Sequence, residues 1–232
     1  MFQIKFIDNL AFNIGKLCAE GRMGYPTAVF LRQGQLDGAC GVYSLLMLLI
    51  LHKRINREDL IFETCSNDPP YVKRLKKQIL YPIKGLYPKG TSLSELREKL
   101  LRVFDNQIHI NIYDAFDNEN KEEEAKILRS KIKEQLDAGW PVLCRYSQPN
   151  IDVGHAVVAI GYTICENFLR LYCLDPSDTI PWFSIWNNII NMKMYCGNEE
   201  WPDYNYKSER KINIDEILLI EENEVKDSSL PF

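Results

Sequence analysis

The sequence predicts an α+β fold, with helices mainly before the middle of the chain and strands mainly after it. Val42 to His52 carries a polar group at only three of its eleven positions and has the length of a buried helix. Ser92 and Glu95 precede apolar residues at helical spacing, which is the pattern of a capped helix. Beyond these, short apolar runs alternate with turn residues. Since no linker divides the 232 residues, we expect one domain with a helical lobe over about 1–107 and a sheet lobe over about 108–225.

The elements expected in the first half rest on alternation, helix caps and proline placement. Alternation favours a strand at the N-terminus, asparagine and serine are common helix caps, and proline is tolerated in a first helical turn. In order, they are a strand over Phe2–Ile7, a short helix or loop over Asn9–Glu20, a loop over Gly21–Pro26, the buried helix, a short helix over Asn56–Glu63, a helix from Pro70 to about Leu80, a loop over Tyr81–Gly90 and the capped helix ending near Phe104.

The second half is predicted to be mostly strands around one helix. An acidic run suits the first turn of that helix and Gly139 ends it. The expected elements are a strand over Ile108–Tyr113, the helix over Asn120–Ala138, strands over Pro141–Tyr146, Gly154–Tyr162 and Phe168–Leu174, an apolar stretch without clear period over Trp182–Tyr195, and a strand or short helix over Lys211–Glu222.

Charge and cysteine content exclude several classes of protein. The net charge of −4 favours neither nucleic acid nor a membrane as partner. The seven cysteines are odd in number and form no CxxC pair, so we expect no disulfide framework, metal or other cofactor. The N-terminus lacks the features of a signal peptide. A cytoplasmic location fits, as does export by a signal-independent route with action in a target cell's cytosol.

Cys40 stands where a glycine-containing loop meets the buried helix. Unpaired N–H groups and the positive end of the helix dipole gather at such a terminus, and both favour a thiolate over a thiol. The alternative is a small, inert core residue, as most free cysteines are. The placement favours a nucleophile, provided that a histidine serves as its base.

Three histidines are candidates for that base. His52 lies twelve residues down the helix from Cys40, roughly 18 Å away, which is too far. His109 lies in an alternating strand and is expected to be partly exposed. His155 follows Gly154 at the start of an apolar strand, where it could face a cleft. A satisfied histidine at a strand end is the alternative for His155.

A catalytic histidine also needs an orienting group and an oxyanion site. Asp175 ends the next strand, and antiparallel pairing would bring its carboxylate beside His155; its alternative role is to form the turn before Pro176. The backbone N–H of Cys40 is one oxyanion donor. A glutamine side chain, Gln33 or Gln35, is a second.

The order glutamine, cysteine, histidine, aspartate resembles the papain-like cysteine peptidases. The likeness is greatest to the peptidase domains of bacteriocin-exporting transporters, which process double-glycine leaders, and to their bacterial relatives. Four pieces carry it: QGQLDGACGVYSLLMLL at Gln33–Leu49, DAGWPVLCRY at Asp137–Tyr146, GHAVVAIGY at Gly154–Tyr162 and LYCLDPSD at Leu171–Asp178.

The resemblance implies a papain-like fold in which Cys40 is the nucleophile, His155 the general base and acid, and Asp175 the orienting residue. The family glutamine usually stands six residues before the cysteine, where this chain has Gly34 between Gln33 and Gln35. Gln33 is favoured if Gly34 marks a small insertion in the loop.

The implied activity is that of a cysteine protease acting on a protein substrate. The same acyl transfer on a glutamine side chain would give a deamidase or transglutaminase, and a non-catalytic interaction module or an immunity or inhibitor module are further alternatives. By analogy, a free-standing papain-like domain of this kind suggests a bacterial effector or toxin with a cognate immunity or adaptor protein.

Overall fold

The computed structural model describes residues 3–13, 15–22, 24–34, 38–60, 68–80, 90–114, 121–149, 151–165, 168–181, 184–193, 203–206 and 210–221. Its helical elements are α1 (Cys40–Leu51), the 3-10 helix η1 (Arg57–Leu60), α2 (Pro70–Leu75), the π-helical turn η2 (Lys76–Leu80), α3 (Leu93–Val103) and α4 (Lys121–Asp137). Its strands are β1 (Lys5–Phe6), β2 (Leu10–Asn13), β3 (Lys16–Glu20), β4 (Pro26–Ala28), β5 (His109–Asp114), β6 (Val142–Gln148), β7 (Ile151–Cys165), β8 (Phe168–Leu174), β9 (Asn188–Lys193), β10 (Asp203–Asn205) and β11 (Arg210–Glu221).

The large sheet is antiparallel throughout, and its central pairings close into a ring. Strand β7 pairs with β6 and β8, β9 links β8 to β10, and β11 pairs with both β10 and β6. Strand β1 adds to β7 and strand β5 adds to β11 outside the ring. The predicted α+β class is confirmed, with the strands over residues 141–146, 154–162 and 168–174 present as β6, β7 and β8.

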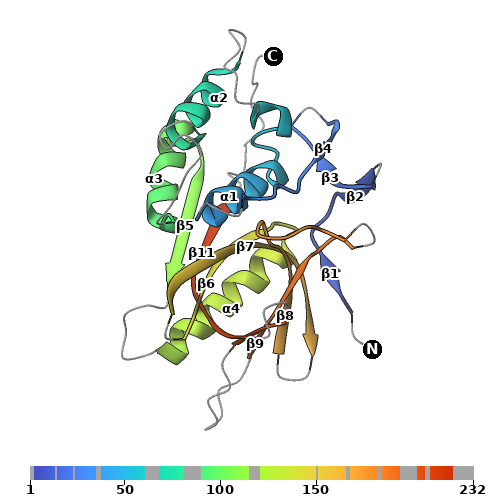
Figure 1. Ribbon diagram of the computed structural model, residues 1–232, viewed down its shortest axis with the longest axis vertical. Helices are drawn as coiled ribbons and strands as arrows, with labels where there is room; N and C mark the ends of the chain where they lie inside the picture. Colours follow the sequence, from blue (N-terminus) through green and yellow to red (C-terminus); the bar gives the residue numbers. More distant parts are fainter. Residues whose placement is uncertain are drawn as a thin grey trace.

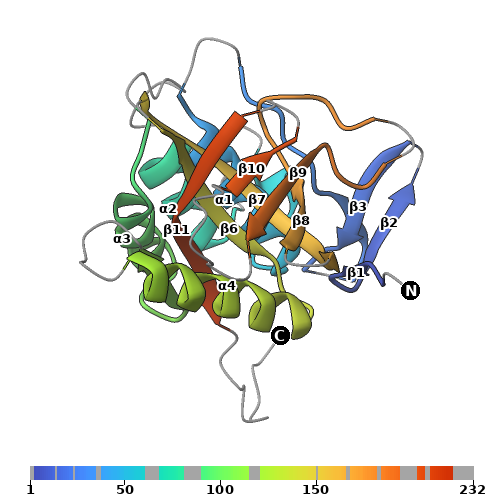
Figure 2. The same cartoon turned by 90° about the horizontal axis from the view of Figure 1, so that it is seen from below.

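Helix α1 lies between the ring of strands and the other N-terminal helices. Figure 1 shows α1 near the centre of the molecule, with α2 above it, α3 to its left and β6 to β9 below. All of its residues from Gly41 to Leu51 are buried except Tyr43, which explains why its sequence has almost no polar face. Helix α4 runs along the underside of the strands in Figure 2. The buried apolar residues of α1, α3, α4 and the strands form one continuous core.

The N-terminal segment differs from the sequence prediction. The short helix or loop expected over Asn9–Glu20 is wrong, because β2 and β3 form an antiparallel hairpin that β4 extends. Asn13 pairs with Lys16 across a two-residue turn, and Gly15 supplies the positive φ of 69° that such a turn needs. The lobe over residues 1–107 is therefore not purely helical, since it begins with strands.

Strand β1 joins the large sheet because Gly161 leaves room for it. A Cβ atom at that position would collide with the ring of Phe6 and the carbonyl of Lys5. Strand β1, from the predicted helical lobe, thus pairs with β7 of the predicted sheet lobe. The division into two lobes at residue 107 did not predict this pairing.

The other elements expected on described residues are found with smaller changes, and the loop expected over Tyr81–Gly90 lies outside the described residues except for Gly90. The Ser92–Glu95 capping box is present on α3. The helix expected over 56–63 is the 3-10 helix η1, with residues 61–63 outside the described part, and the closing segment is the strand β11. Strand β9 lies in the stretch that showed no clear period. No helix in the described part of the chain is both long and apolar enough to cross a membrane.

Candidate active site

His155 and Asp175 lie beside each other where β7 and β8 meet the loop that follows β8. The Nε2 atom of His155 is 2.8 Å from Oδ1 of Asp175. Strand β8 ends at Leu174, which pairs with Val158, so the next residue reaches along β7 towards position 155. The proximity predicted from antiparallel pairing is therefore present.

Asp175 is held by a dense set of hydrogen bonds. Its Oδ1 accepts from the backbone N–H and the hydroxyl of Ser177 at 2.9 and 2.6 Å, and its Oδ2 accepts from Nδ2 of Asn188 at 2.8 Å. The side chain of Asn187 bonds to both the N–H and the C=O of Asp175, at 2.7 and 2.8 Å. The carboxylate is almost fully buried, and these donors fix its orientation towards His155.

Cys40 is the first residue of α1 and faces His155 from the other side of the imidazole. The thiol and the ring share a side-chain hydrogen bond. Because Nε2 of His155 is bonded to Asp175, Nδ1 is the ring nitrogen left for Cys40. The N-cap residue is Ala39, whose side chain cannot accept a hydrogen bond from the N–H groups of the first turn. The three side chains therefore form a continuous chain of contacts with the histidine in the middle.

Helix α1 is locked to β7 next to His155. The hydroxyl of Ser44, one turn after Cys40, donates to the carbonyl of Ala156 at 2.9 Å. The backbone N–H of Ala156 in turn donates to the sulfur of Cys40. This two-point contact positions the Cys40 thiol against the strand that carries His155.

The electrostatics of the site favour a thiolate–imidazolium pair. Burial by itself raises the pKa of the Cys40 thiol, but the hydrogen bond and charge of His155, with the N–H groups of Ala156 and Gly41, bring that pKa below the ordinary value. Burial by itself lowers the pKa of His155, and the contacts with Asp175 and Cys40 outweigh it and raise that pKa to about 10. By contrast, burial raises the pKa of the Cys144 thiol to about 12. Cys40 is thus set apart chemically from a buried structural cysteine.

Of the two glutamines predicted for the oxyanion site, only Gln33 lies in the described part of the chain; Gln35 lies outside it. The backbone N–H of Gln33 donates to the carbonyl of Pro176 at 2.9 Å, which ties the loop before Cys40 to the loop after Asp175. The side-chain Oε1 of Gln33 is buried and forms no hydrogen bond to a described residue. The oxyanion role of either glutamine stays a prediction.

The other two histidines lie away from this constellation. His52 is the C-cap of α1, at the opposite end from Cys40, and stacks on Trp140 with ring centroids 4.9 Å apart. His109 is exposed at the start of β5, as predicted.

Sequence reasoning missed the residues that support the triad. Ser44 has a recognisable signal, because it is a lone hydroxyl on the apolar helix, one turn after Cys40 and so on the same face. Asn187 and Asn188 are a polar pair that interrupts an apolar stretch, but their contact with Asp175 depends on how β9 pairs with β8. Tyr146, opposite His155 in the register, sets its ring edge-on to the imidazole at 5.4 Å.

Comparison with known proteins adds no assignment. A scan of the sequence against protein-family models found no match. A search of the curated proteins also found no match.

Proposed function

We propose that this chain is a papain-like cysteine peptidase that hydrolyses peptide bonds of a protein substrate. The observation that carries the proposal is the placement of His155 between Cys40 and Asp175, with the thiol at the N-terminus of a buried helix. A nucleophile, a base and a group that orients the base are the three parts that acyl transfer needs. The order of the three residues along the chain and the helix-against-strands arrangement support the papain-like assignment.

In the proposed mechanism the Cys40 thiolate attacks the carbonyl carbon of the scissile bond. The negative charge that develops on the carbonyl oxygen is stabilised by backbone N–H groups at the start of α1 and by a glutamine amide. The imidazolium of His155 donates its Nδ1 proton to the leaving amine, and the resulting neutral ring then takes a proton from the water that hydrolyses the thioester. Asp175 holds Nε2 throughout and stabilises the positive charge of the ring.

Deamidation or transglutamination would use the same residues on a glutamine side chain, and the test distinguishes these reactions from hydrolysis. Purified wild type and Cys40→Ala are each incubated with cell lysates, and new protein N-termini are mapped by mass spectrometry together with Gln-to-Glu mass shifts. We expect new N-termini with wild type only. Cys165→Ala, which changes a partly exposed cysteine outside the site, is the matched control and should cleave normally.

Each outcome of this experiment decides between the functions. Cys40→Ala should lower the rate by at least about a thousandfold, since the nucleophile is removed. Mass shifts without new N-termini would make the protein a deamidase. Full activity in Cys40→Ala would overturn the mechanism. A non-catalytic module would be favoured if neither wild type nor Cys40→Ala produced new N-termini or mass shifts and iodoacetamide labelled Cys40 of the wild type no faster than Cys165.

A further inference from the structure

A cavity of about 360 Å³ lies beside the loop that carries Asp175. Its lining comes from Gly15 and the start of β3, the end of β4 and the segment after it, η1, and the residues that follow the Asp175 turn. The lining residues are Gly15, Lys16, Leu17, Ala28, Phe30, Arg32, Arg57, Thr179 and Ile180.

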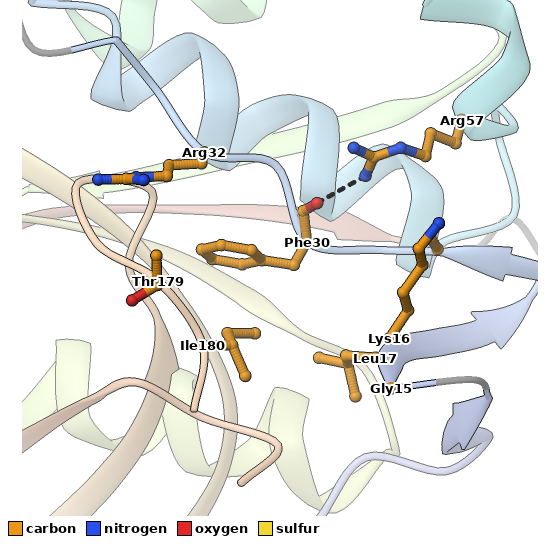
Figure 3. Close-up of a pocket in the computed structure, with 9 residues that line it drawn as sticks. Gly15, Lys16, Leu17, Phe30, Arg32, Arg57, Thr179 and Ile180 are labelled. Atoms are coloured by element: carbon orange, nitrogen blue, oxygen red, sulfur yellow. Dashed lines mark hydrogen bonds between the residues drawn. The ribbon is translucent and has the colours of Figure 1, made fainter. Parts of the chain in front are cut away.

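The cavity has an apolar centre and a cationic rim. Figure 3 shows the Phe30 ring, Leu17 and Ile180 at the centre, with Lys16 and Arg57 on one side and Arg32 above Thr179 on the other. Three of the lining residues are cations and none is a carboxylate. In a chain of net charge −4, this is a concentration of positive charge that packing does not require.

The rim cations are available to a ligand. Lys16 and Arg32 are exposed, and neither forms an ion pair within the described part of the chain. Within the described part of the chain, the guanidinium of Arg57 donates one hydrogen bond, from Nη1 to the carbonyl of Phe30 at 2.6 Å. This bond anchors the group at the rim, and its other N–H groups have no partner among the described residues.

Two of the segments that line the cavity continue into the proposed catalytic site. Arg32 directly precedes Gln33, whose N–H is bonded to the carbonyl of Pro176. Thr179 and Ile180 continue the turn in which the N–H of Asp178 contacts the carbonyl of Asp175 at 3.4 Å. The side of the cavity formed by Arg32 and Thr179 is therefore the side that adjoins the Asp175 loop.

We propose that this cavity is a specificity pocket for an acidic residue of the substrate, with its carboxylate at the cationic rim and a neighbouring apolar side chain against Phe30 and Ile180. The inference rests on the proposed peptidase activity and adds a substrate class to it. Guanidinium groups bind carboxylates through paired N–H donors, and the apolar centre excludes water from the contact.

The test is cleavage of a proteome-derived peptide library by wild type, Lys16→Glu, Arg32→Glu and Lys77→Glu. Lys77 is an exposed cation on η2 outside the cavity, so it controls for the change in net charge. We expect wild type and Lys77→Glu to favour Asp or Glu at one fixed position relative to the cleaved bond. Lys16→Glu and Arg32→Glu should each reduce that preference by about threefold to tenfold, and higher salt should weaken it. Cleavage without an acidic preference, or a preference that both pocket variants retain, would overturn the pocket and leave the peptidase standing.

A binding measurement separates failure of the pocket from failure of the peptidase. The inactive Cys40→Ala protein is titrated into a short fluorescein-labelled peptide that carries Glu beside Phe, and into its Gln analogue, with fluorescence anisotropy as the readout. If the library is not cleaved at all, the proposed function fails. The pocket is then supported by tighter binding of the Glu peptide that Arg32→Glu abolishes, and is refuted by equal binding of the two peptides.

Discussion

Helix α1 has an imidazole ring near each end, and the two rings have opposite pKa shifts. Beside Cys40, at the start of the helix, the pKa of His155 is raised to about 10 by Asp175 and the thiol. At the end of the helix, burial and the charge of Arg54 lower the pKa of His52 to about 3. The carbonyl of Pro141 offsets this only in part, because neither ring nitrogen forms a well-aligned hydrogen bond to a described residue. Burial alone therefore gives a neutral ring, and only a paired charge gives the protonated ring that a cysteine nucleophile needs.

The strongest way to break this comparison is His155→Gln. Without an imidazolium beside it, the Cys40 thiol loses the hydrogen bond and the charge of His155, which lower its pKa most. Burial, the largest single effect, then shifts that pKa upwards, against the N–H groups of Ala156 and Gly41 that remain. We expect activity to fall by at least about a thousandfold. Iodoacetamide should label Cys40 as fast as in wild type only at a higher pH. Unchanged labelling at pH 6 would mean that the helix terminus alone, not His155, activates the thiol.

Asp175→Asn tests the other side of the ring. The amide keeps the shape of the carboxylate but removes its charge, and it presents a donor where Ser177 and Asn188 now donate. The pKa of His155 should fall, and kcat/KM should drop by about ten- to a hundredfold, less than for His155→Gln. The pH dependence of cleavage is the readout, with the decline on the alkaline side moving to lower pH. An unaltered profile would show that Asp175 only forms the turn before Pro176.

Ser44→Ala tests the lock between α1 and β7. It removes the donor to the buried carbonyl of Ala156 and should cost about 1–2 kcal/mol of stability, measured by urea unfolding. Labelling of Cys40 should also require a higher pH, since the N–H of Ala156 no longer meets the sulfur in a fixed geometry. Ser130→Ala, at an exposed helical position, is the control. Loss of stability with unchanged labelling would make Ser44 a packing residue only.

His52→Phe is expected to change pH-dependent stability and leave activity unchanged. Below pH 6.5 the unfolded chain binds a proton at His52 that the folded protein does not bind until about pH 3, so wild-type stability falls across this window as the pH falls. Phenylalanine can keep the stack on Trp140 without that proton, and it should be more stable than wild type by about 2 kcal/mol at pH 5. His109→Gln, at an exposed position, serves as the control. Equal acid sensitivity in wild type and His52→Phe would contradict the lowered pKa.

The parts of the fold that the sequence predicts well are those with local signals. The Ser92–Glu95 capping box, the apolar run of α1 and the alternation in β6 to β8 each lie within one element. The hairpin of β2 and β3 also has a local signal, the turn residue Gly15. The composition of the segment around Gly15 is compatible with a helix, so the hairpin was not predicted.

The remaining features depend on contacts between distant parts of the chain. The pairing of β1 with β7 and the closing of the ring by β9 and β10 join residues that carry no local mark of their partners. For the candidate site, the sequence predicted the neighbours Cys40, His155 and Asp175. It did not predict Asn187 and Asn188, because their contact with Asp175 follows from the pairing of β8 with β9.

The ring of strands also determines when the candidate site can form during synthesis. The strand that carries His155 is paired with β6, and β6 is held on its other side by β11, which ends at Glu221. At ordinary elongation rates, Cys40 leaves the ribosome roughly 10 to 40 s before the end of β11 does. A nascent chain therefore carries Cys40 well before the strands that hold His155 in place are complete. The proposed thiolate–imidazolium pair is thus expected to form only after nearly all of the described chain has been made.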